Sequence, residues 1–491
     1  MLLFFVGLFI LIAGYFTYGK FVERVIGPDS RQTPANTMRD GVDYVTLPHW
    51  KNMLIQLLNI AGVGPVIGVI IGIKFGEWVF LIIPIGNIIA GATHDFLAGM
   101  MSIRNKGANL PKIVKDNLGS TYSKFFSVFT IVLLLLVVTV FINIPADLFN
   151  KLLPEAELFW FAVGLIFFYY IAATLFPIDK IIGKFYPLFG AMLLIGTFAI
   201  FVAMLFMMVD DVDMLTPSTE FLSVQWDSEN GHPIIPLLFV TIACGIISGF
   251  HATQSPIIAR TMSSEYQARS SFYGMMVIEG IVAMIWAAAA MVIYNEFPDS
   301  FSKNPTYVLL QITNYFLGSY VGVLTVIAVI ILAVTSGDTA MRSVRLCFSE
   351  MFAIPQKTFS KRLFVCIPFI MIVSFLLTWS KTDAESFNHL WNYFAWGNQV
   401  LAVSTLVAGA VWLFAQQKNG YIALIPGAFM CFIVVSYITW TCPEHGGPFG
   451  CGLDLETSYW IAGALTILIS VIIKARGEKM ASIKCDNIDK N

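Results

Sequence analysis

Long apolar segments alternate with short polar stretches along the whole chain. Each segment is long enough for a membrane-spanning helix, which needs about 20 predominantly apolar residues. The strands of a membrane barrel would instead alternate polar and apolar positions over about ten residues. The pattern therefore predicts an all-α polytopic membrane protein with about thirteen transmembrane helices. The predicted spans are 2–19, 50–73, 78–103, 124–146, 157–177, 184–209, 233–258, 270–295, 317–341, 362–379, 388–416, 420–440 and 457–474.

Basic residues gather on one side of these spans, and their positions predict the orientation of the chain. If the N-terminus lies outside, only four of the 29 Lys and Arg residues fall on the outer side: Lys74, Lys151, Lys303 and Lys381. Cytoplasmic loops of membrane proteins carry an excess of Lys and Arg. We therefore expect an external N-terminus, a cytoplasmic C-terminus and an acidic external loop at 210–232.

Two predicted spans contain Gly and Pro clusters that disfavour a continuous helix. Residues 59–65 read Asn-Ile-Ala-Gly-Val-Gly-Pro, and residues 245–256 read Gly-Ile-Ile-Ser-Gly-Phe-His-Ala-Thr-Gln-Ser-Pro. Unwound backbone within a membrane is tolerated where it lines a protein cavity. Breaks at matching positions of two five-span units indicate an inverted 5+5 repeat with a binding site between the breaks. The alternative is close helix packing through small residues.

The repeat divides the chain into five parts. We expect an extra N-terminal helix and a cytoplasmic segment at 1–49, and the first repeat at 50–209. The acidic loop at 210–232 separates it from the second repeat at 233–416. Two extra helices and a cytoplasmic tail follow at 417–491.

Composition excludes several classes of protein. Hydrophobic residues make up 57% of the 491 and charged residues only 12%, about half the charge of a soluble globular chain. The net charge of −2 gives no basic excess for nucleic acid. The chain has neither a Walker A sequence nor a Cys-x-x-Cys pair, and no set of nucleophilic or metal-binding residues suggests an enzyme.

Short motifs occur in a fixed order between residues 33 and 402. They are Thr33-Pro34-Ala35, Asp40-Gly41-Val42-Asp43-Tyr44, Ala61-Gly62-Val63-Gly64-Pro65, Gly91-Ala92-Thr93-His94-Asp95, Ile242-Ala243-Cys244-Gly245, Ser248-Gly249-Phe250-His251, Asp338-Thr339-Ala340 with Arg342, and Asn398-Gln399-Val400-Leu401-Ala402. In these motifs the sequence resembles the carbon starvation protein (CstA) family of bacterial inner-membrane transporters. It departs from the family in its shorter length, in Thr46-Leu47, and in Ile55-Gln56-Leu57, where members often carry His-His-Phe.

The resemblance implies a fold, a function and a location. The fold is expected to be LeuT-like, of the amino acid–polyamine–organocation type, which agrees with the 5+5 repeat. The function implied is uptake of peptides, pyruvate or amino acids during carbon starvation, by H⁺ or Na⁺ symport with alternating access, in the bacterial cytoplasmic membrane. A substrate-gated channel and a membrane nutrient sensor are the alternatives, and neither substrate nor oligomeric state follows from the sequence.

Polar and glycine residues at the two breaks are the candidate substrate-binding residues. Exposed helix N-termini at such breaks favour anionic groups, so a carboxylate suits the free N–H groups there. The candidates are Asn59, Gly62, Gly64, Ser248, Gly249, His251, Thr253 and Gln254. For His251 the alternative is a core histidine that is hydrogen-bonded to a carbonyl.

Candidate ion-coupling residues lie within the spans, where charge is costly. They are Asp95, Glu279, Thr335, Ser336 and Asp338. In LeuT-like transporters a sodium ion lies between the helix that here carries Thr335 and Ser336 and the first broken helix. Hydroxyl and carbonyl oxygens suit such a hard cation. The possible Na⁺ ligands are Ile60, Ala61, Gly64, Thr335 and Ser336; no other cofactor is expected.

Three alternatives to a sodium site stay open. Asp338 can instead carry a proton or form a salt bridge with Arg342, one turn away. Asp95 and Glu279 can relay protons, pair with His251, or cap N–H groups of the broken helices.

A separate prediction concerns the last external loop. Cys442 and Cys451 flank a Gly- and Pro-rich turn on the oxidising side of the membrane, so a Cys442–Cys451 disulfide is expected. A zinc site with His445 and Asp454 is the alternative.

Overall fold

A computed structural model describes residues 1–153, 157–175, 182–356, 358–381, 384–445 and 447–488, and every regular element in these ranges is a helix. Ten segments are long and apolar enough to cross a membrane, and one bent pair of helices forms an eleventh. The prediction of an all-helical polytopic membrane protein is thus confirmed. The total of thirteen spans and the exact 5+5 repeat stay predictions.

The ten segments overlap ten of the predicted spans. They are α1 (Leu2–Phe16) with α2 (Tyr18–Ile26); α6 (Val79–Gly86), η3 (Asn87–Gly91) and α7 (Ala92–Arg104); α9 (Ser120–Leu152); α11 (Ile182–Asp210); η6 (Glu265–Gln267), η7 (Arg269–Gly274) and α16 (Met275–Glu296); α17 (Pro305–Met351); α18 (Phe359–Trp379); α19 (Ala384–Phe414); α20 (Tyr421–Trp440); and α21 (Leu455–Ile488). Short helices connect them: α3 (Pro34–Thr37), α8 (Leu110–Leu118), α12 (Thr219–Val224), η8 (Pro298–Ser302) and η9 (Pro443–His445).

Three predicted spans differ from simple helices. The span at 157–177 is α10 (Phe159–Leu175), 17 residues long, and its last two predicted residues lie outside the described ranges. The other two, at 50–73 and 233–258, are broken where Gly and Pro cluster. A further helix, α17, is longer than its predicted 317–341 and is kinked at Gly318, whose φ is +68°.

The first broken span bends by 54° between two helical halves. Its first half is α4 (His49–Ile60), and its second half comprises η1 (Gly64–Gly68), α5 (Val69–Gly72) and η2 (Ile73–Phe75). Between them lie Ala61, Gly62 and Val63. The break therefore falls inside the predicted Ala-Gly-Val-Gly-Pro run.

The second broken span is more fragmented. It consists of η5 (Ile234–Leu238), α13 (Phe239–Thr241), α14 (Ala243–Ile246) and α15 (Gly249–Ala259), and Ile247 and Ser248 are extended. The two breaks face each other, because a side chain at Gly64 would overlap Cys244 and one at Gly72 would overlap Ile242. Glycine at these positions allows the broken spans to pack directly against one another.

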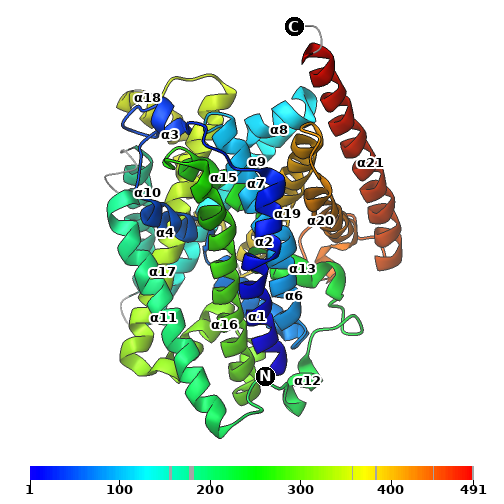
Figure 1. The fold of residues 1–491 in the computed structure, drawn as a ribbon. Coiled ribbons are helices and arrows are strands. Elements are labelled where there is room, and N and C mark those ends of the chain that lie inside the picture. The colour runs from blue at the N-terminus through cyan, green and yellow to red at the C-terminus, as the bar shows by residue number, and fades with distance from the viewer. Residues whose placement is uncertain (154–156, 176–181, 357, 382–383, 446, 489–491) are drawn as a thin grey trace.

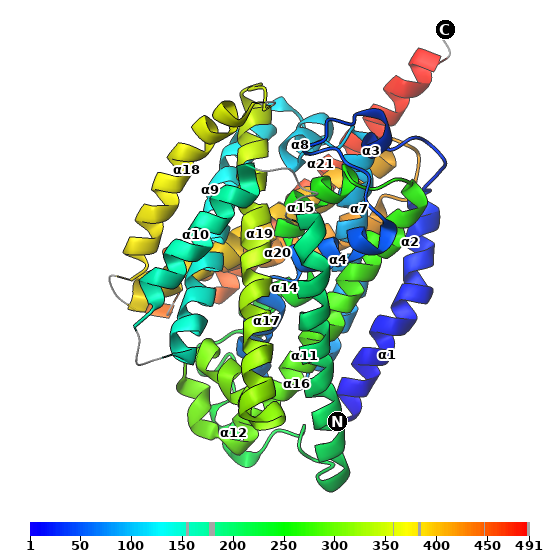
Figure 2. The same cartoon turned by 90° about the vertical axis from the view of Figure 1, so that its left-hand side faces the viewer.

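The remaining helices surround this pair. The most extensive packing in the molecule is between α9 and α17, while α16 packs against α4, α5 and η1. Helices α1 and α21 lie on the outside of the bundle, α1 against α6 and α16, and α21 against α19 and α20 (Figures 1 and 2). The N- and C-termini are at opposite ends of the bundle (Figure 1). An odd number of crossings requires that arrangement.

The predicted Cys442–Cys451 disulfide is not present, because both thiols are free. Backbone hydrogen bonds close this loop instead. Cys451 N–H donates to the Ile438 carbonyl (3.0 Å) and Leu453 N–H to that of Thr439 (2.9 Å), which folds the loop back onto the end of α20. The His445 ring stacks on Trp440 with centroids 4.9 Å apart.

Close packing beside the second break yields a stability prediction. A side chain at Gly249 would overlap the backbone of Ala402 and Asn398, which cannot move as a flexible side chain can. We expect Gly249→Ala to destabilise the protein by about 1–3 kcal/mol, measured as a lower melting temperature in detergent. Gly164→Ala in α10, where nothing lies within 4 Å, is the control. Equal melting temperatures for the two variants would contradict this packing.

Candidate functional site

Four titratable side chains form a continuous buried chain in the middle of the bundle. His94 Nδ1 lies 2.8 Å from Asp95 Oδ1, and His251 Nδ1 lies 3.0 Å from Asp95 Oδ2. On its other side, His251 Nε2 lies 3.7 Å from Glu279 Oε2. We call His94, Asp95, His251 and Glu279 the buried His–carboxylate chain. The structure thus brings together three predicted site residues and adds His94.

Three separate elements contribute to this chain. His94 and Asp95 lie in the first turn of α7, His251 lies in the first turn of α15 directly after the second break, and Glu279 lies on α16. His251 therefore links the second broken span to α7 and α16.

All four side chains are fully buried. A lone charge at such a place is very costly, whereas imidazoles beside carboxylates can share protons without exposing charge to lipid. Within the described part of the chain, neither oxygen of Glu279 has a hydrogen-bond partner, and neither do Nε2 of His94 and His251. These atoms are therefore available to bind a water, a proton or a polar ligand.

Asn398 and Gln399 on α19 satisfy the extended backbone of the second break. Asn398 Oδ1 accepts a hydrogen bond from Phe250 N–H (2.6 Å), and its amide donates to Ser248 Oγ (2.8 Å). Gln399 donates to the Ile247 carbonyl (3.4 Å). The Asn-Gln motif was quoted in the sequence analysis, but no role was assigned to it there. The sequence feature that pointed to this role was a pair of amide side chains inside a predicted span.

Asn87 has a similar role on the opposite side of the second break. Its amide donates to the carbonyls of Gly245 (3.1 Å) and Met276 (3.0 Å). It thereby joins the end of α14 to α16, next to Glu279. Sequence reasoning did not select Asn87 either, although it is an uncharged polar residue in an otherwise apolar segment.

Near the first break, buried amides lack partners. Gln56 and Asn59 on α4 are fully buried, and none of their amide atoms has a hydrogen-bond partner among the described residues. Buried polar groups are rarely left unpaired, so such a cluster points to an unseen water or ligand. Asn59 was a predicted substrate residue; Gln56 was noted only as a departure from the family motif.

The hydroxyls predicted to hold sodium are partly engaged. Ser336 Oγ donates to the Leu58 carbonyl (2.8 Å) and lies close to Gly62, whereas Thr335 Oγ1 donates to Leu332 within its own helix (2.9 Å). Ser336 therefore reaches the first broken span one turn before the predicted carbonyls of Ile60, Ala61 and Gly64.

The remaining predicted residues pack where α15 meets α17. Ser343 Oγ donates to the Thr253 carbonyl (3.1 Å), and the Gln254 amide donates to Thr253 Oγ1 (2.8 Å). Asp338 is 1% exposed and follows Gly337, whose missing side chain makes space for the Tyr170 hydroxyl.

Residues 27–48, which we call the strap, cross the end of the bundle where α15, the last helix of the second broken span, terminates. Thr33 Oγ1 donates to the Met262 carbonyl (2.6 Å), and the backbone N–H groups of Val45 and Leu47 donate to Arg260 (3.2 Å) and Thr261 (3.0 Å). The strap is therefore hydrogen-bonded to Arg260, Thr261 and Met262, which directly follow α15. We call this end of the molecule the strap end.

An ion triad fixes the strap to α17. Asp43 Oδ1 lies 2.9 Å from Arg342 Nη1 and 3.5 Å from Arg345 Nη2, and all three side chains are largely buried. Burial by itself raises the pKa of Asp43, but the guanidinium groups of Arg345, Arg342 and Arg260 outweigh it, so that the pKa lies below its usual value. Arg342 also donates to the Ala173 carbonyl of α10. Arg342 thus pairs with Asp43, a partner that spacing along α17 did not predict.

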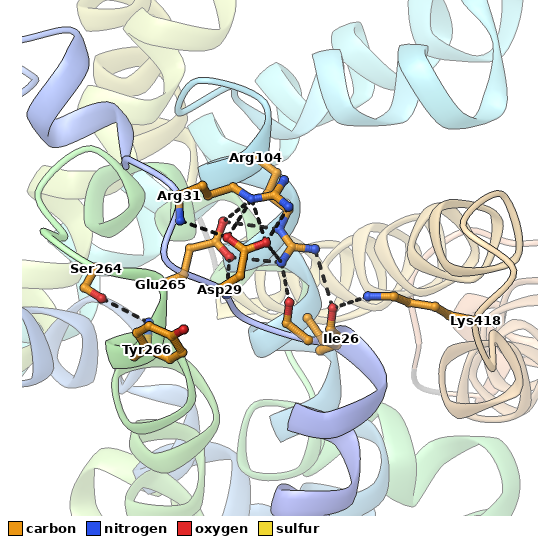
Figure 3. Close-up of polar contacts among 9 residues, drawn as sticks. Ile26, Asp29, Arg31, Arg104, Ser264, Glu265, Tyr266 and Lys418 are labelled. Atoms are coloured by element: carbon orange, nitrogen blue, oxygen red, sulfur yellow. Dashed lines mark hydrogen bonds and ion pairs between the residues drawn. The ribbon is translucent and has the colours of Figure 1, made fainter. Parts of the chain in front are cut away.

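A second network anchors the start of the strap (Figure 3). The buried carboxylate of Glu265 accepts from Arg104 Nη2 (2.9 Å) and from the Asp29 N–H (3.1 Å). The hydrogen bond and charge of Arg31 lower the pKa of Asp29 to about 2. Lys418 donates to the Ile26 carbonyl (2.5 Å). The network ties the strap to α7, η6 and the α19–α20 loop.

Cavities are present at both ends of the bundle. At the strap end, a cavity of about 810 Å³ is lined by Asp43, Tyr44, Arg260 and Glu350, among others. At the opposite end, a cavity of about 250 Å³ lies between the broken spans, α19 and α20, and includes Ile71, Thr241, Trp391 and Tyr437.

Two solved structures superimpose on most of the chain. The chain superimposes on a mutant of the manganese transporter of Eremococcus coleocola with a TM-score of 0.55 and 16% identity, over 90% of this chain and 99% of the other. It superimposes on MhsT in complex with L-phenylalanine with a TM-score of 0.57 and 12% identity, over 87% and 99%. The chain therefore shares the LeuT-like fold of these structures.

Sequence comparison identifies the family of the chain. The family model described as carbon starvation protein CstA matches residues 1–163, 156–304 and 298–437. The chain belongs to the CstA family.

Among its relatives, an uncharacterised membrane protein of Haemophilus influenzae is 40% identical over 60% of this chain and 92% of its own. The peptide transporter CstA of Bacillus subtilis is 25% identical over 87% and 88%. The peptide transporter CstA of Campylobacter jejuni is 26% identical over 58% of this chain, but the match spans only 49% of that protein.

The hydrogen bonds of Asn398 lead to a mutational prediction. Asn398→Ala leaves the Phe250 N–H and Ser248 without their partner in a buried position, which costs about 1–3 kcal/mol. We expect a lower melting temperature in detergent. The control is Thr405→Val on the same helix, because among the described residues the Thr405 hydroxyl bonds only to the Leu401 carbonyl within α19 (2.9 Å). Equal melting temperatures of the Asn398→Ala and Thr405→Val variants would show that Asn398 does not stabilise the second break.

Asp43 yields a pH prediction. Its folded pKa is lowered, so its stabilising contribution is complete above the unfolded pKa of about 3.9 and is lost as pH falls through the folded value. We expect Asp43→Asn to cost about 3–5 kcal/mol near pH 7, because two buried guanidinium groups lose their counter-ion. The difference in melting temperature from wild type should shrink below about pH 4.

The matched control for Asp43 is Asp116→Asn, which breaks an exposed Lys112–Asp116 pair (2.8 Å) and should cost at most about 1 kcal/mol. An Asp43→Asn effect that stays constant from pH 7 to pH 3 would show that the charge of Asp43 is not responsible.

Proposed function

We propose that the protein is a secondary active transporter for small carboxylated nutrients, namely peptides, pyruvate or amino acids, taken up during carbon starvation by alternating access. The observation that carries the proposal is the position of His251. It lies directly after the second break and contacts Asp95 on one scaffold helix and Glu279 on another. Substrate binding at the breaks is thereby linked to a titratable group.

The substrate is proposed to bind between the two breaks. Unpaired amide atoms of Gln56 and Asn59 lie on one side, and Ser248, Thr253 and Gln254 on the other. Gly62, Gly64 and Gly249 let Phe141, Cys244 and the backbone of α19 pack directly against the two breaks and so shape the walls of the proposed site. The first turn of α15 offers N–H groups that favour a carboxylate. Peptide transport by the named relatives supports this substrate class.

Coupling to protons follows from the buried His–carboxylate chain. When Glu279 or His251 gains or loses a proton, the charge between α15 and α16 changes in a region without water screening. Such a change alters the free energy of any movement that separates His251 from Asp95 or Glu279. A proton can therefore favour one orientation of the broken span over the other, which is the requirement for symport.

Access from the two ends is proposed to alternate through the strap. The strap is held to the segment that directly follows α15 through four hydrogen bonds, and to α17 through the Asp43–Arg342 pair. Movement of α15 away from α17 would have to break these contacts. The strap then acts as the closing element at one end, which we assign to the cytoplasm from the distribution of Lys and Arg.

Sodium coupling is the second candidate, favoured by the contact between Ser336 and the Leu58 carbonyl. This contact brings a hydroxyl of α17 to the first broken span, where Thr335, Ile60, Ala61 and Gly64 are the other proposed ligands. Uptake at fixed pH with and without a sodium gradient separates the candidates. Proton coupling predicts equal accumulation in both, and loss of accumulation without sodium would favour the sodium site.

The proton chain is tested by Glu279→Gln in proteoliposomes. We expect accumulation driven by a pH gradient to fall at least tenfold, while substrate counterflow, which needs no net proton movement, continues. Glu296→Gln at the end of the same helix is the control, because Glu296 does not belong to the buried His–carboxylate chain. Full gradient-driven accumulation by Glu279→Gln would exclude a coupling role for Glu279.

The same assay distinguishes a transporter from a channel or a nutrient sensor. A channel would let substrate equilibrate without accumulation, and a sensor would bind substrate without moving it. Pyruvate, short peptides and amino acids should be compared as substrates.

A further inference from the structure

A cavity near the strap end is lined by lysines and lies outside the proposed transport site. Its volume is about 580 Å³, within the range of ligand-binding cavities. It lies between α8, the start of α9 and the end of α17. Its lining includes Lys112, Lys115 and Lys124, three serines, and an apolar wall formed in part by Val128, Met351 and Phe352.

The cavity is strongly basic. Three lysines face one carboxylate, Glu350, whose Oε2 already accepts a hydrogen bond from Asn109 (2.7 Å). Lys112 forms an exposed pair with Asp116, whereas Lys115 and Lys124 form no ion pair in the described part of the chain. The cavity therefore attracts an anion, and α9 directs its N-terminal N–H groups into the same region.

The position of the cavity relative to the bilayer follows from helix length. Helix α9 has 33 residues and is about 50 Å long, some 20 Å more than the hydrocarbon core of a bilayer. Its first turns therefore stand at the level of lipid headgroups. Exposed apolar side chains continue from there along α9: Phe125 is 76% and Val128 56% exposed. Basic groups at headgroup level above an apolar surface match an amphiphilic anion.

We propose that this cavity binds one anionic phospholipid, with the phosphodiester beside Lys112, Lys115 and Lys124 and an acyl chain along Val128, Met351 and Phe352. Basic pockets between membrane helices are known to bind such headgroups. Because Cys347 and Glu350 of α17 form one wall and α9 the other, the bound lipid bridges the two helices with the most extensive packing in the molecule.

The test measures melting temperature in detergent after adding lipid. Phosphatidylglycerol should raise the melting temperature of wild type by several degrees, and phosphatidylcholine should raise it much less. The triple variant K112Q/K115Q/K124Q should lose most of the shift. The matched control K20Q/K361Q/K479Q removes the same charge from exposed lysines outside the cavity and should retain the shift.

A second variant separates the site from a general charge effect. Val128→Trp fills the apolar part of the cavity without changing charge, and it too should abolish the phosphatidylglycerol shift. Inorganic phosphate is added in parallel. An equal shift with inorganic phosphate, or an unchanged phosphatidylglycerol shift in both the lysine and Val128→Trp variants, would overturn the proposal.

Discussion

Backbone hydrogen bonding inside the membrane is the constraint on which the rest of this structure depends. Where no water is available, each unwound peptide group needs a partner within the protein. The second break is stabilised by Asn398 and Gln399, neighbours on α19, and by Asn87 of η3. The break can exist only because α19 and η3 are packed against it.

The same break places His251 where it meets two carboxylates. Asp95 and Glu279 come from helices that flank the broken span, so their charges are partly compensated by one imidazole. This arrangement makes charge at the membrane centre tolerable. The strap at the end of the same span is held by the buried Asp43–Arg342–Arg345 triad. The buried His–carboxylate chain and the strap are therefore connected through α15 and the residues that follow it.

Much of the candidate site was predictable from residue type. Charges and Gly–Pro clusters are rare within apolar spans, so Asp95, Glu279, His251 and both breaks could be selected without a structure. Asn87, Gln56 and the role of Asn398 were not selected, because a single amide in an apolar span has no pattern that identifies its partner. The Cys442–Cys451 disulfide was wrong, because spacing and compartment do not determine whether two sulfur atoms meet.

By itself, the sequence determined that the chain crosses a membrane many times and where two of its spans break. These properties depend on local hydrophobicity and backbone propensity, which each segment carries alone. Only the tertiary structure decided which residues meet: Asp43 with Arg342 over 299 positions, His251 with Asp95 over 156. Such contacts arise from how helices far apart in the chain pack, and that packing depends on the shape of all their side chains together.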